Sequence, residues 1–446
     1  MSEKMKESGV EWIGEIPEEW GVGKVKYFSE ISAGGTPNRN VEEYWNGHIN
    51  WMASGEVNQR KVIHTLEKIT ELGLRNSAAK LLPKGTVVLA LNGQGKTKGM
   101  AAILDIEASS NQSLASFIVD EINLHNRYLW YYFLANYKNI RAMKGEGRDG
   151  LNLQLVSNIQ LPIPSFAEQR HISDYLDKQS QRFDQATNLI KAEITQLCAY
   201  KKSLIYETVT KGLDKNVQFK DSGVDWIGEI PVGWEVKKFK YFFETTKGLS
   251  ITKEKLTDKG IPVISYGQIH SKYGRKVDST KDLLPFVPED YLRYKQALLT
   301  KGNFIFADTS EDIEGSGNFS TRTDGEGRLF AGYHTIIARL LDTKNNDFRY
   351  VMYLFDSEWF RNQIRHSVSG VKVFSITQSI LKNTTILFPI ALAEQKAIAD
   401  YLDKKIHKIN EIIKIKEQQL TNLSEQRKTL IYEVITGKRR ISENSV

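Results

Sequence analysis

The amino-acid sequence predicts an α+β protein. In this fold two mixed α/β domains are separated and joined by two long, antiparallel, coiled-coil-like helices, as a pseudo-two-fold tandem repeat. Three observations lead to the prediction. Blocks of the first half of the chain recur in the second half, two proline-free segments carry an apolar seven-residue period, and the segments between them mix short apolar runs with turn residues.

The repeat decides the architecture. Residues 6–28 (KESGVEWIGEIPEEWGVGKVKYF) recur as residues 220–242 (KDSGVDWIGEIPVGWEVKKFKYF), with 16 of 23 positions identical at an offset of 214. Residues 167–179 recur as 393–405 with 9 of 13 positions identical, at an offset of 226. The second copy therefore holds 226 − 214 = 12 extra residues in its middle.

The middles of the two copies, residues 29–160 and 243–386, share little sequence but the same order of features. Both show short mixed runs punctuated by Gly and Pro, followed by one predicted helix, at 128–143 and at 350–366. Similar scaffolds carrying different modules are expected when each module reads something different.

Each module leads into a predicted long helix. The first helix opens with Ser165-x-x-Glu168, a capping-box pattern, whereas the second copy has Ala391 at the serine position and so needs a weaker or different cap. Gly212 and Gly437 are the predicted stops. Roughly 44 residues at about 1.5 Å each give a rod of about 65 Å.

An apolar seam runs along each predicted helix with a period of seven, which Lys416 interrupts in the second helix. One rod alone would leave its seam in water, so the two rods are expected to pack on each other, with self-association between chains as the alternative. Leu189 and Tyr200 are expected to help off the seam. The seam, a candidate partner-docking surface, comprises Leu176, Phe183, Ile190, Leu197, Leu204, Leu402, Ile409, Leu423 and Leu430.

These patterns divide the chain into sequential parts. We expect a first module with its N-terminal repeat segment at 1–160, a first spacer helix at 161–213, a second module at 214–386, and a second spacer helix with a tail at 387–446. Four tryptophans of the repeat blocks are predicted to anchor packing at the rod ends: Trp12, Trp20, Trp226 and Trp234.

The amino-acid composition limits the classes of function that the chain can have. Lys and Arg (61) exceed Asp and Glu (54) by 7, which permits a polyanionic partner without demonstrating one. The single cysteine, Cys198, argues against disulfides and a Cys-rich metal cage and favours a reducing compartment. The absence of a long apolar run or an apolar leader predicts a soluble, cytoplasmic protein without a membrane partner.

Catalytic motifs are absent or only apparent. Asn92-Gly-Gln-Gly-Lys-Thr97 resembles a P-loop, but Ala90 stands where its first glycine belongs. No Pro-Pro dipeptide occurs, so the Asx-Pro-Pro-aromatic motif of an amino-methyl transferase is missing. The acidic residues around Asp308 are better explained as a surface loop than as a nuclease cluster, and the eight histidines lack metal-ligand spacing. We therefore assign no catalytic residue and no metal ligand.

Polar and basic residues in the modules are candidates for DNA contacts. A flexible loop with Gly, Gln, Lys and Thr suits approach to a phosphate and hydrogen bonding to base edges, with a solvated hairpin as the alternative. The polar stretch 309–322 occupies a comparable place in the second module. The candidates are Arg39, Arg60, Lys61, Gln94, Lys96, Thr97, Lys98, Lys272, Arg275, Lys276 and Arg322.

Taken together, several segments resemble the specificity subunit of type I restriction-modification enzymes. These are GGTPNRNVEEYWNGHINWMASGEV at 34–57, LNGQGKTKGMAAI at 91–103, the proline-then-AEQ entry to each rod, and the rod ends LIYETVTKG and LIYEVITGK. The resemblance covers essentially the whole chain. It implies that each module is a target-recognition domain that reads one half of a bipartite site in double-stranded DNA, and that the helices set the spacing between the halves.

The resemblance also implies partners. The helices would dock two modification subunits, which bind S-adenosylmethionine and methylate adenine, and restriction subunits would translocate DNA with ATP and magnesium and cut it. This chain would bind no cofactor itself and would be a non-catalytic, nucleoid-associated part of a prokaryotic phage-defence system. Two alternatives remain: a DNA-associated scaffold that reads no sequence, and a stand-alone DNA-modifying enzyme.

Overall fold

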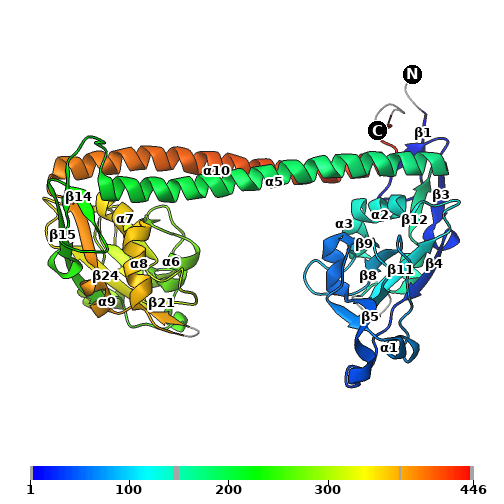
Figure 1. Ribbon diagram of the computed structural model, residues 1–446, viewed down its shortest axis with the longest axis horizontal. Coiled ribbons are helices and arrows are strands. Elements are labelled where there is room, and N and C mark those ends of the chain that lie inside the picture. Colours follow the sequence, from blue (N-terminus) through cyan, green and yellow to red (C-terminus); the bar gives the residue numbers. More distant parts are fainter. Residues whose placement is uncertain (1–3, 144–149, 371–372, 442–446) are drawn as a thin grey trace. The chain divides into compact units, whose positions relative to one another are not determined.

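Two compact units make up the protein. The computed structural model describes residues 4–143, 150–370 and 373–441. Unit 1 comprises Met1–Lys191 with Glu417–Val446, and unit 2 comprises Ala192–Lys416. Each unit therefore contains one module together with part of both long helices (Figure 1). This division differs from the sequential one expected from the sequence, because each long helix contributes to both units.

The two long helices are α5, Phe166–Lys211, and α10, Leu392–Ile435, of 46 and 44 residues. The Oγ of Ser165 accepts the amide of Glu168 at 3.3 Å, as the capping-box pattern predicts. At α10 the backbone carbonyl of Ala391 accepts the amide of Glu394 at 3.1 Å, so this cap is made differently. Gly212 and Gly437 follow the helices with φ of 77° and 74°, the left-handed conformation of a glycine stop.

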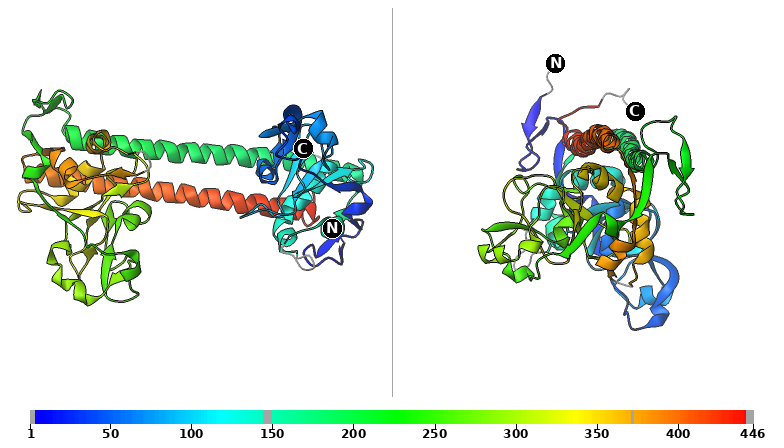
Figure 2. Two further views of the ribbon diagram at one scale, coloured as in Figure 1. Left: turned by 90° about the horizontal axis from the view of Figure 1, so that it is seen from below. Right: turned by 90° about the vertical axis from the view of Figure 1, so that its left-hand side faces the viewer.

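Within each unit, the segments of α5 and α10 run side by side in opposite directions (Figures 1 and 2). Residues early in one segment pair with residues late in the other. The pairs are Lys416–Glu193 (2.6 Å) and Lys201–Asn410 (2.8 Å) in unit 2, and Arg427–Asp184 (2.5 Å) in unit 1.

The module of unit 1 is built on a five-stranded sheet of order β4-β11-β8-β9-β6. Only β6 runs parallel to its neighbour within this sheet. The strands are β4 Ser29–Ala33, β11 Leu114–Val119, β8 Val87–Ala90, β9 Ala101–Leu104 and β6 Lys61–Val62. Smaller sheets comprise β10 Ser109–Ser110, β5 Trp45–Met52 and β7 Glu67–Ile69; β12 Gln160–Ile163 with β3 Gly21–Lys24; and β1 Met5–Glu7 with β2 Glu15–Pro17.

The module of unit 2 repeats this topology strand for strand. Its main sheet has the order β16-β24-β20-β22-β18: Phe243–Lys247, Thr335–Leu340, Phe304–Ala307, Phe319–Arg322 and Lys276–Val277. The smaller sheets are β19 Phe286–Val287, β17 Ile261–Ile264 and β23 Phe330–Ala331; β15 Trp234–Lys238 with β26 Thr385–Pro389; and β13 Phe219–Asp221 with β14 Glu229–Pro231. An added pair, β21 Thr309–Ser310 and β25 Phe374–Ser375, accompanies its longer middle.

The central strand of each main sheet is apolar on both faces because each face belongs to a different core. Alternate side chains of a strand point to opposite faces. In β20, Phe304 and Phe306 join the core shared with the long helices, whereas Ile305 and Ala307 join the core under the smaller sheet. In β8, residues 87 and 89 and residues 88 and 90 divide in the same way.

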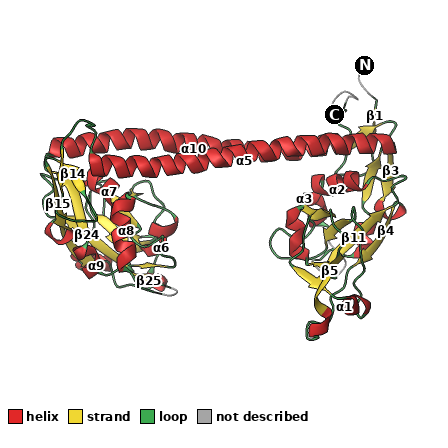
Figure 3. Cartoon of the chain, in the orientation of Figure 1, coloured by secondary structure: helices red, strands yellow, loops and turns green. Residues whose placement is uncertain are grey.

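The helix predicted in each module is in fact two. Residues 128–143 fall in α2 (Asn126–Ala135) and α3 (Tyr137–Ala142), and residues 350–366 fall in α7 (Phe348–Asp356) and α8 (Glu358–Ser367) (Figure 3). Asn136 and Ser357 break the helices. Ser357 is extended, with φ −67° and ψ 146°, and its Oγ accepts the amide of Phe360, so it caps α8. Among the described residues, the remaining α-helices are α1 Glu71–Arg75, α4 Leu153–Ser157, α6 Tyr266–Ser271 and α9 Gln378–Asn383.

Three of the four predicted tryptophan anchors are confirmed. Trp20 and Trp234 are buried, and their Nε1 atoms donate to the carboxylates at the helix starts, Glu168 at 3.1 Å and Glu394 at 2.9 Å. Trp12 is half-buried and donates to the hydroxyl of a tyrosine of α2 at 3.2 Å. The prediction for Trp226 is wrong, because this side chain is 55% exposed, although its ring centroid lies 5.4 Å from that of Trp359 in α8.

A buried tyrosine ties each module to the helices. Tyr128 of α2 has its hydroxyl 3.1 Å from the carbonyl oxygens of both Pro162 and Ile435. Tyr350 of α7 repeats this arrangement with carbonyl oxygens of β26 and α5, at 3.0 and 3.2 Å. Both tyrosines are fully buried. Each hydroxyl thus holds a strand, a module helix and a long-helix end together.

Tyr128→Phe and Tyr350→Phe should each lower the free energy of unfolding by about 1 kcal/mol, since each leaves buried carbonyls without a donor while keeping the ring. Tyr241→Phe, at a 65% exposed position, is the matched control and should leave stability within about 0.5 kcal/mol of the parent. Chemical denaturation followed by circular dichroism measures all three. If the buried variants are as stable as the control, the two tyrosine hydroxyls do not stabilise the contact between module and helices.

Candidate nucleic-acid interface

A glycine-rich loop joins β8 to β9 in unit 1, and three of its glycines have positive φ. Two residues of α3 hold its backbone. Arg141 donates to the carbonyl oxygens of Gly95 (2.6 Å) and Lys98 (3.2 Å), and the hydroxyl of Tyr137 donates to that of Lys96 (2.6 Å). The carbonyls therefore point inward to α3.

This arrangement leaves polar side chains of the loop free to face outward. Gln94 and Lys96 are exposed, and Thr97 is half-buried. Lys98 lies at the base of the loop, where its Nζ is 3.4 Å from the carbonyl oxygen of Met143. The loop thus presents an amide, an ammonium and a hydroxyl on a backbone fixed from behind, a set of groups able to contact phosphates and base edges.

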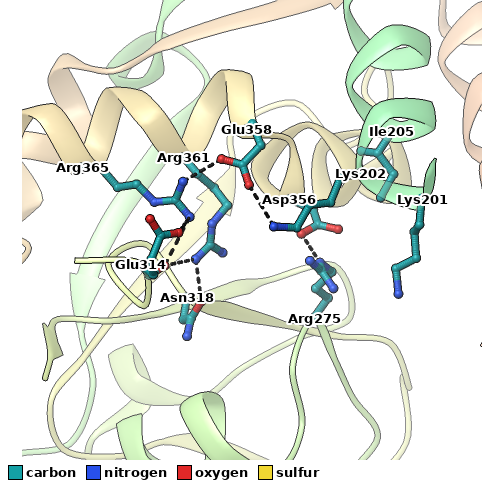
Figure 4. Close-up of a pocket in the computed structure, with 10 residues that line it drawn as sticks. All are labelled: Lys201, Lys202, Ile205, Arg275, Glu314, Asn318, Asp356, Glu358, Arg361 and Arg365. Atoms are coloured by element: carbon teal, nitrogen blue, oxygen red, sulfur yellow. Dashed lines mark hydrogen bonds and ion pairs between the residues drawn. The ribbon is translucent and has the colours of Figure 1, made fainter. Parts of the chain in front are cut away.

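The loop between β20 and β22, residues 308–318, takes the same place in unit 2. Arg361 of α8 donates to the carbonyl oxygen of Glu314 (2.8 Å) and to the side chain of Asn318 (2.7 Å) (Figure 4). His270 bridges the carbonyl oxygen of Thr309 (2.8 Å) and the amide of Asn318 (2.9 Å) through its two ring nitrogens. An arginine behind the loop is thus common to both modules, whereas the loop residues differ.

Arg39 is held in a defined position on the smaller sheet of unit 1. Both its terminal nitrogens bond the carboxylate of Glu67, at 2.5 and 3.0 Å, and its guanidinium lies over the rings of Trp45 (4.2 Å) and Trp51 (5.1 Å). The hydrogen bond to Glu67 raises the pKa of Arg39 above its usual value. Its side chain is still 54% exposed, so it keeps a free edge for a further contact.

Lys61 belongs to a cluster that fastens the module of unit 1 to α5. The carboxylate of Asp177 accepts from Lys61 (3.3 Å), Arg127 (2.7 Å) and the hydroxyl of Tyr131 (2.8 Å). Arg127 also binds Asp174 at 2.6 Å. Burial alone would raise the pKa of Asp177, but the hydrogen bonds from Arg127 and Tyr131 outweigh it and lower that pKa.

The same cluster recurs in unit 2, where Lys276 takes the place of Lys61. The carboxylate of Asp403 accepts from Lys276 (3.1 Å), Arg349 (3.4 Å) and the hydroxyl of Tyr353 (2.7 Å). Arg349 also binds Asp400 at 2.6 Å. We call these two clusters, around Asp177 and Asp403, the carboxylate clamps.

Sequence reasoning placed Lys61 and Lys276 among DNA contacts and missed the rest of the clamps. A signal was available, because both carboxylates lie in the duplicated blocks, as DYLD at 174–177 and at 400–403. Both lysines remain about half exposed, at 48% and 54%. Their clamp contacts give them a role inside their own units, and a DNA contact stays a prediction.

The other basic candidates are placed differently from one another. The prediction for Arg322 is wrong, because its side chain is only 3% exposed and donates to Asp324 and to backbone carbonyls. Arg275 forms an ion pair with Asp356 at the cleft of Figure 4. Lys272 is exposed at the end of α6. Arg60 lies just before β6, where burial lowers its pKa and the charge of Arg427 lowers it further.

Seven of the nine seam residues, all but Ile190 and Leu423, pack in the core of their own unit. Five are buried: Leu176, Leu204, Leu402, Ile409 and Leu430. The other four are half-buried: Phe183, Ile190, Leu197 and Leu423. The buried five are closed to a partner protein, which corrects their prediction as docking residues. The expected help from Leu189 and Tyr200 is also wrong, since these side chains are 66% and 53% exposed.

Neither a metal centre nor a membrane helix is found in the described part of the chain. Within residues 4–143, 150–370 and 373–441, no three or more His, Cys, Asp or Glu side chains gather as a metal site would require. Among the same residues, no helix combines the length and the apolar character needed to cross a bilayer.

A family model described as the type I restriction modification DNA specificity domain matches residues 17–196 and again residues 231–422. The chain belongs to this family. It is similar to the type I restriction enzyme MjaVIII specificity subunit of Methanocaldococcus jannaschii, with 24% identity over 430 residues that cover 96% of this chain and 94% of that protein.

Two solved structures share the family's fold with this chain. One comes from a study of complex assembly and conformational transition in the type I R-M system, with a TM-score of 0.72, 13% identity, and coverage of 95% of this chain and 99% of that one. The other is the HsdS subunit of Thermoanaerobacter tengcongensis, with a TM-score of 0.53, 14% identity, and coverage of 95% and 98%.

Asp177→Asn tests how a module of this family is fastened. Removing the charge should lower the free energy of unfolding of unit 1 by about 2 kcal/mol, because Arg127 then loses part of its compensation in a half-buried site. Asp105→Asn, in an exposed pair with Lys84, should cost less than about 0.5 kcal/mol. Denaturant titration gives the free energy of unfolding of both variants. Equal losses of stability would contradict a stabilising role of the carboxylate clamp.

Proposed function

We propose that the chain is the DNA-specificity subunit of a type I restriction-modification enzyme. One observation carries the proposal: two modules of the same topology present different loops at the same place in the sheet. The shared topology suits the same mode of DNA binding in both modules, and the different loops suit recognition of two different DNA sequences. Membership of the family supports this reading.

Each module would read one half of a bipartite site in double-stranded DNA. In unit 1 the β8–β9 loop offers Gln94 and Lys96, whose groups can bond base edges and phosphates. In unit 2 the equivalent loop carries a different set of polar groups. The fixed backbones of both loops support sequence reading, since a positioned donor discriminates better than a mobile one.

The long helices would set the spacing between the half-sites. At about 1.5 Å per residue, the 46 residues of α5 extend for about 69 Å. We infer that α5 and α10 pack as an antiparallel coiled coil and that their outer surfaces dock two modification subunits. A rigid spacer of fixed length restricts the separation of two reading modules, as in dimeric DNA-binding proteins.

The partner subunits would carry out the chemical steps. The modification subunits would bind S-adenosylmethionine and methylate an adenine flipped from the helix, and the restriction subunits would use ATP and magnesium. This chain would choose the base and hold the partners over it, without a catalytic group or cofactor of its own. Because its substrates would be genomic DNA and DNA that enters the cell, the protein would act in the cytoplasm.

Ile412 and Ile415 favour a second candidate function, a protein scaffold that reads no sequence. These side chains of α10 are 43% and 58% exposed and could contact other proteins. A scaffold alone gives no reason for modules with different loops. The two candidates differ in whether the assembled complex protects a discontinuous DNA sequence.

Exchange of residues 29–160 for the corresponding module of another specificity subunit should change one half of the methylated sequence and leave the other half intact. The reason is that each module carries its own loops on its own sheet. Methylation-aware sequencing of DNA from cells that express the hybrid complex reports both halves directly. A change in both halves, or in neither, would count against the proposal.

Lys96→Ala should weaken binding of the assembled complex to its cognate duplex about tenfold at moderate salt, because an exposed ammonium on a fixed loop is lost. Lys84→Ala is the matched control. That lysine lies in the same module but pairs with Asp105, so its removal should change the affinity less than twofold. Fluorescence anisotropy measures the affinity of both variants. If Lys96→Ala binds the duplex as tightly as the parent, the β8–β9 loop does not contact DNA.

A further inference from the structure

In unit 2 a cation of the module and a cation of a long helix line the same cleft, and unit 1 has cations at the equivalent positions. In unit 2 they are Arg275, just before β18, and Lys201 of α5; in unit 1 they are Arg60, just before β6, and Arg427 of α10. Residues 201–210 (KKSLIYETVT) recur as residues 427–436 (RKTLIYEVIT) at the offset of 226. Lys201 and Arg427 are the first residues of these two segments, so the two pairs occupy equivalent places.

In unit 2 the pair lines a cleft of about 210 Å³ between α5 and the module (Figure 4). Asp356 pairs with Arg275, and Asn410 accepts from Lys201 at 2.8 Å. Cations outnumber carboxylates around this cleft by five to three. They are Lys201, Lys202, Arg275, Arg361 and Arg365, against Glu314, Asp356 and Glu358.

In unit 1 the carboxylate comes from a different place. Arg427 bonds Asp184 at 2.5 Å, and position 184 corresponds to Asn410 at the offset of the repeat. In each unit, then, one member of the cation pair is bonded to a carboxylate: Arg427 to Asp184 in unit 1 and Arg275 to Asp356 in unit 2. The carboxylate stands next to the helix cation in unit 1 and next to the module cation in unit 2, so the pair of cations is retained although the carboxylate residue is not.

Bringing like charges together is unfavourable. Burial lowers the pKa of Lys201, and Arg275 lowers it further; burial lowers the pKa of Arg60, and Arg427 lowers it further. Arg60 also has a positive φ of 63°, a strained conformation for a residue with a side chain. Two copies with divergent middles thus keep the same unfavourable pairing, and a bound anion would offset it.

We propose that each of these pairs, Arg60 with Arg427 and Arg275 with Lys201, binds one phosphodiester of the DNA backbone. A phosphodiester supplies the negative charge that the excess of cations over carboxylates around the unit 2 cleft would attract. The positions are common to both units and lie outside the differing loops, which suits contacts that fix the DNA without reading its sequence. This inference rests on the proposed function and adds the contact that positions the DNA against the helices.

The test uses the complex assembled with its modification subunits and the cognate duplex. Arg275→Gln combined with Lys201→Gln should reduce the slope of log K against log salt concentration by about 0.9, the value for one lost phosphate contact. The ratio of cognate to non-cognate affinity should stay unchanged. Arg275→Lys should retain the parent slope, and Lys408→Gln, at an exposed position of α10, is the control for loss of charge.

Each outcome bears on the inference. A lower slope with intact discrimination supports it. An unchanged slope, or a slope change accompanied by loss of cognate preference, overturns it. Weaker assembly with the modification subunits at an unchanged slope also overturns it, because the anion would then be a carboxylate of the partner. If the parent complex shows no preference for any duplex, the proposed function fails instead.

Discussion

Each recognition module depends on one carboxylate of a long helix. Asp177 and Asp403 each receive a lysine, an arginine and a tyrosine from the module, at distances between 2.7 and 3.4 Å. Apolar packing is non-directional, so the directional contacts between module and helices come from hydrogen bonds such as those of Tyr128 and Tyr350 and from the clamps. Three bonds to a half-buried acceptor restrict rotation of the module and so fix the direction of its loops.

The loops follow from this constraint. A main sheet held against the long helices carries the β8–β9 or β20–β22 loop at a fixed place, and an arginine from α3 or α8 then fixes the loop carbonyls. Arg141 and Arg361 do this work with different partners, because one bonds two carbonyls and the other a carbonyl and an asparagine. The same scaffold thus carries two different loop sequences, which lets the two modules differ in the groups that their loops expose.

Much of this architecture could be predicted from the sequence. The repeat gave two equivalent modules, and the caps and glycine stops gave helix ends that match the structure. The breaks at Asn136 and Ser357 could not be predicted from apolar periodicity, because the pattern continues across them. The surroundings of single side chains could not be predicted in the same way. Arg322 looks like a surface cation in the sequence, and only the folded chain surrounds it with hydrogen-bond acceptors. The clamps were missed because their members come from distant segments.

One feature of the units bears on how the chain acquires its fold during translation. Unit 2 is continuous, residues 192–416, whereas unit 1 joins Met1–Lys191 to Glu417–Val446. The module of unit 1 therefore leaves the ribosome early, yet Tyr128 meets its acceptor at Ile435 only after all of unit 2 has been synthesised. Until then its helix-facing core, which includes Leu430 and Val434, stays incomplete. The first module made is the second to be finished, and it must stay soluble in the interval.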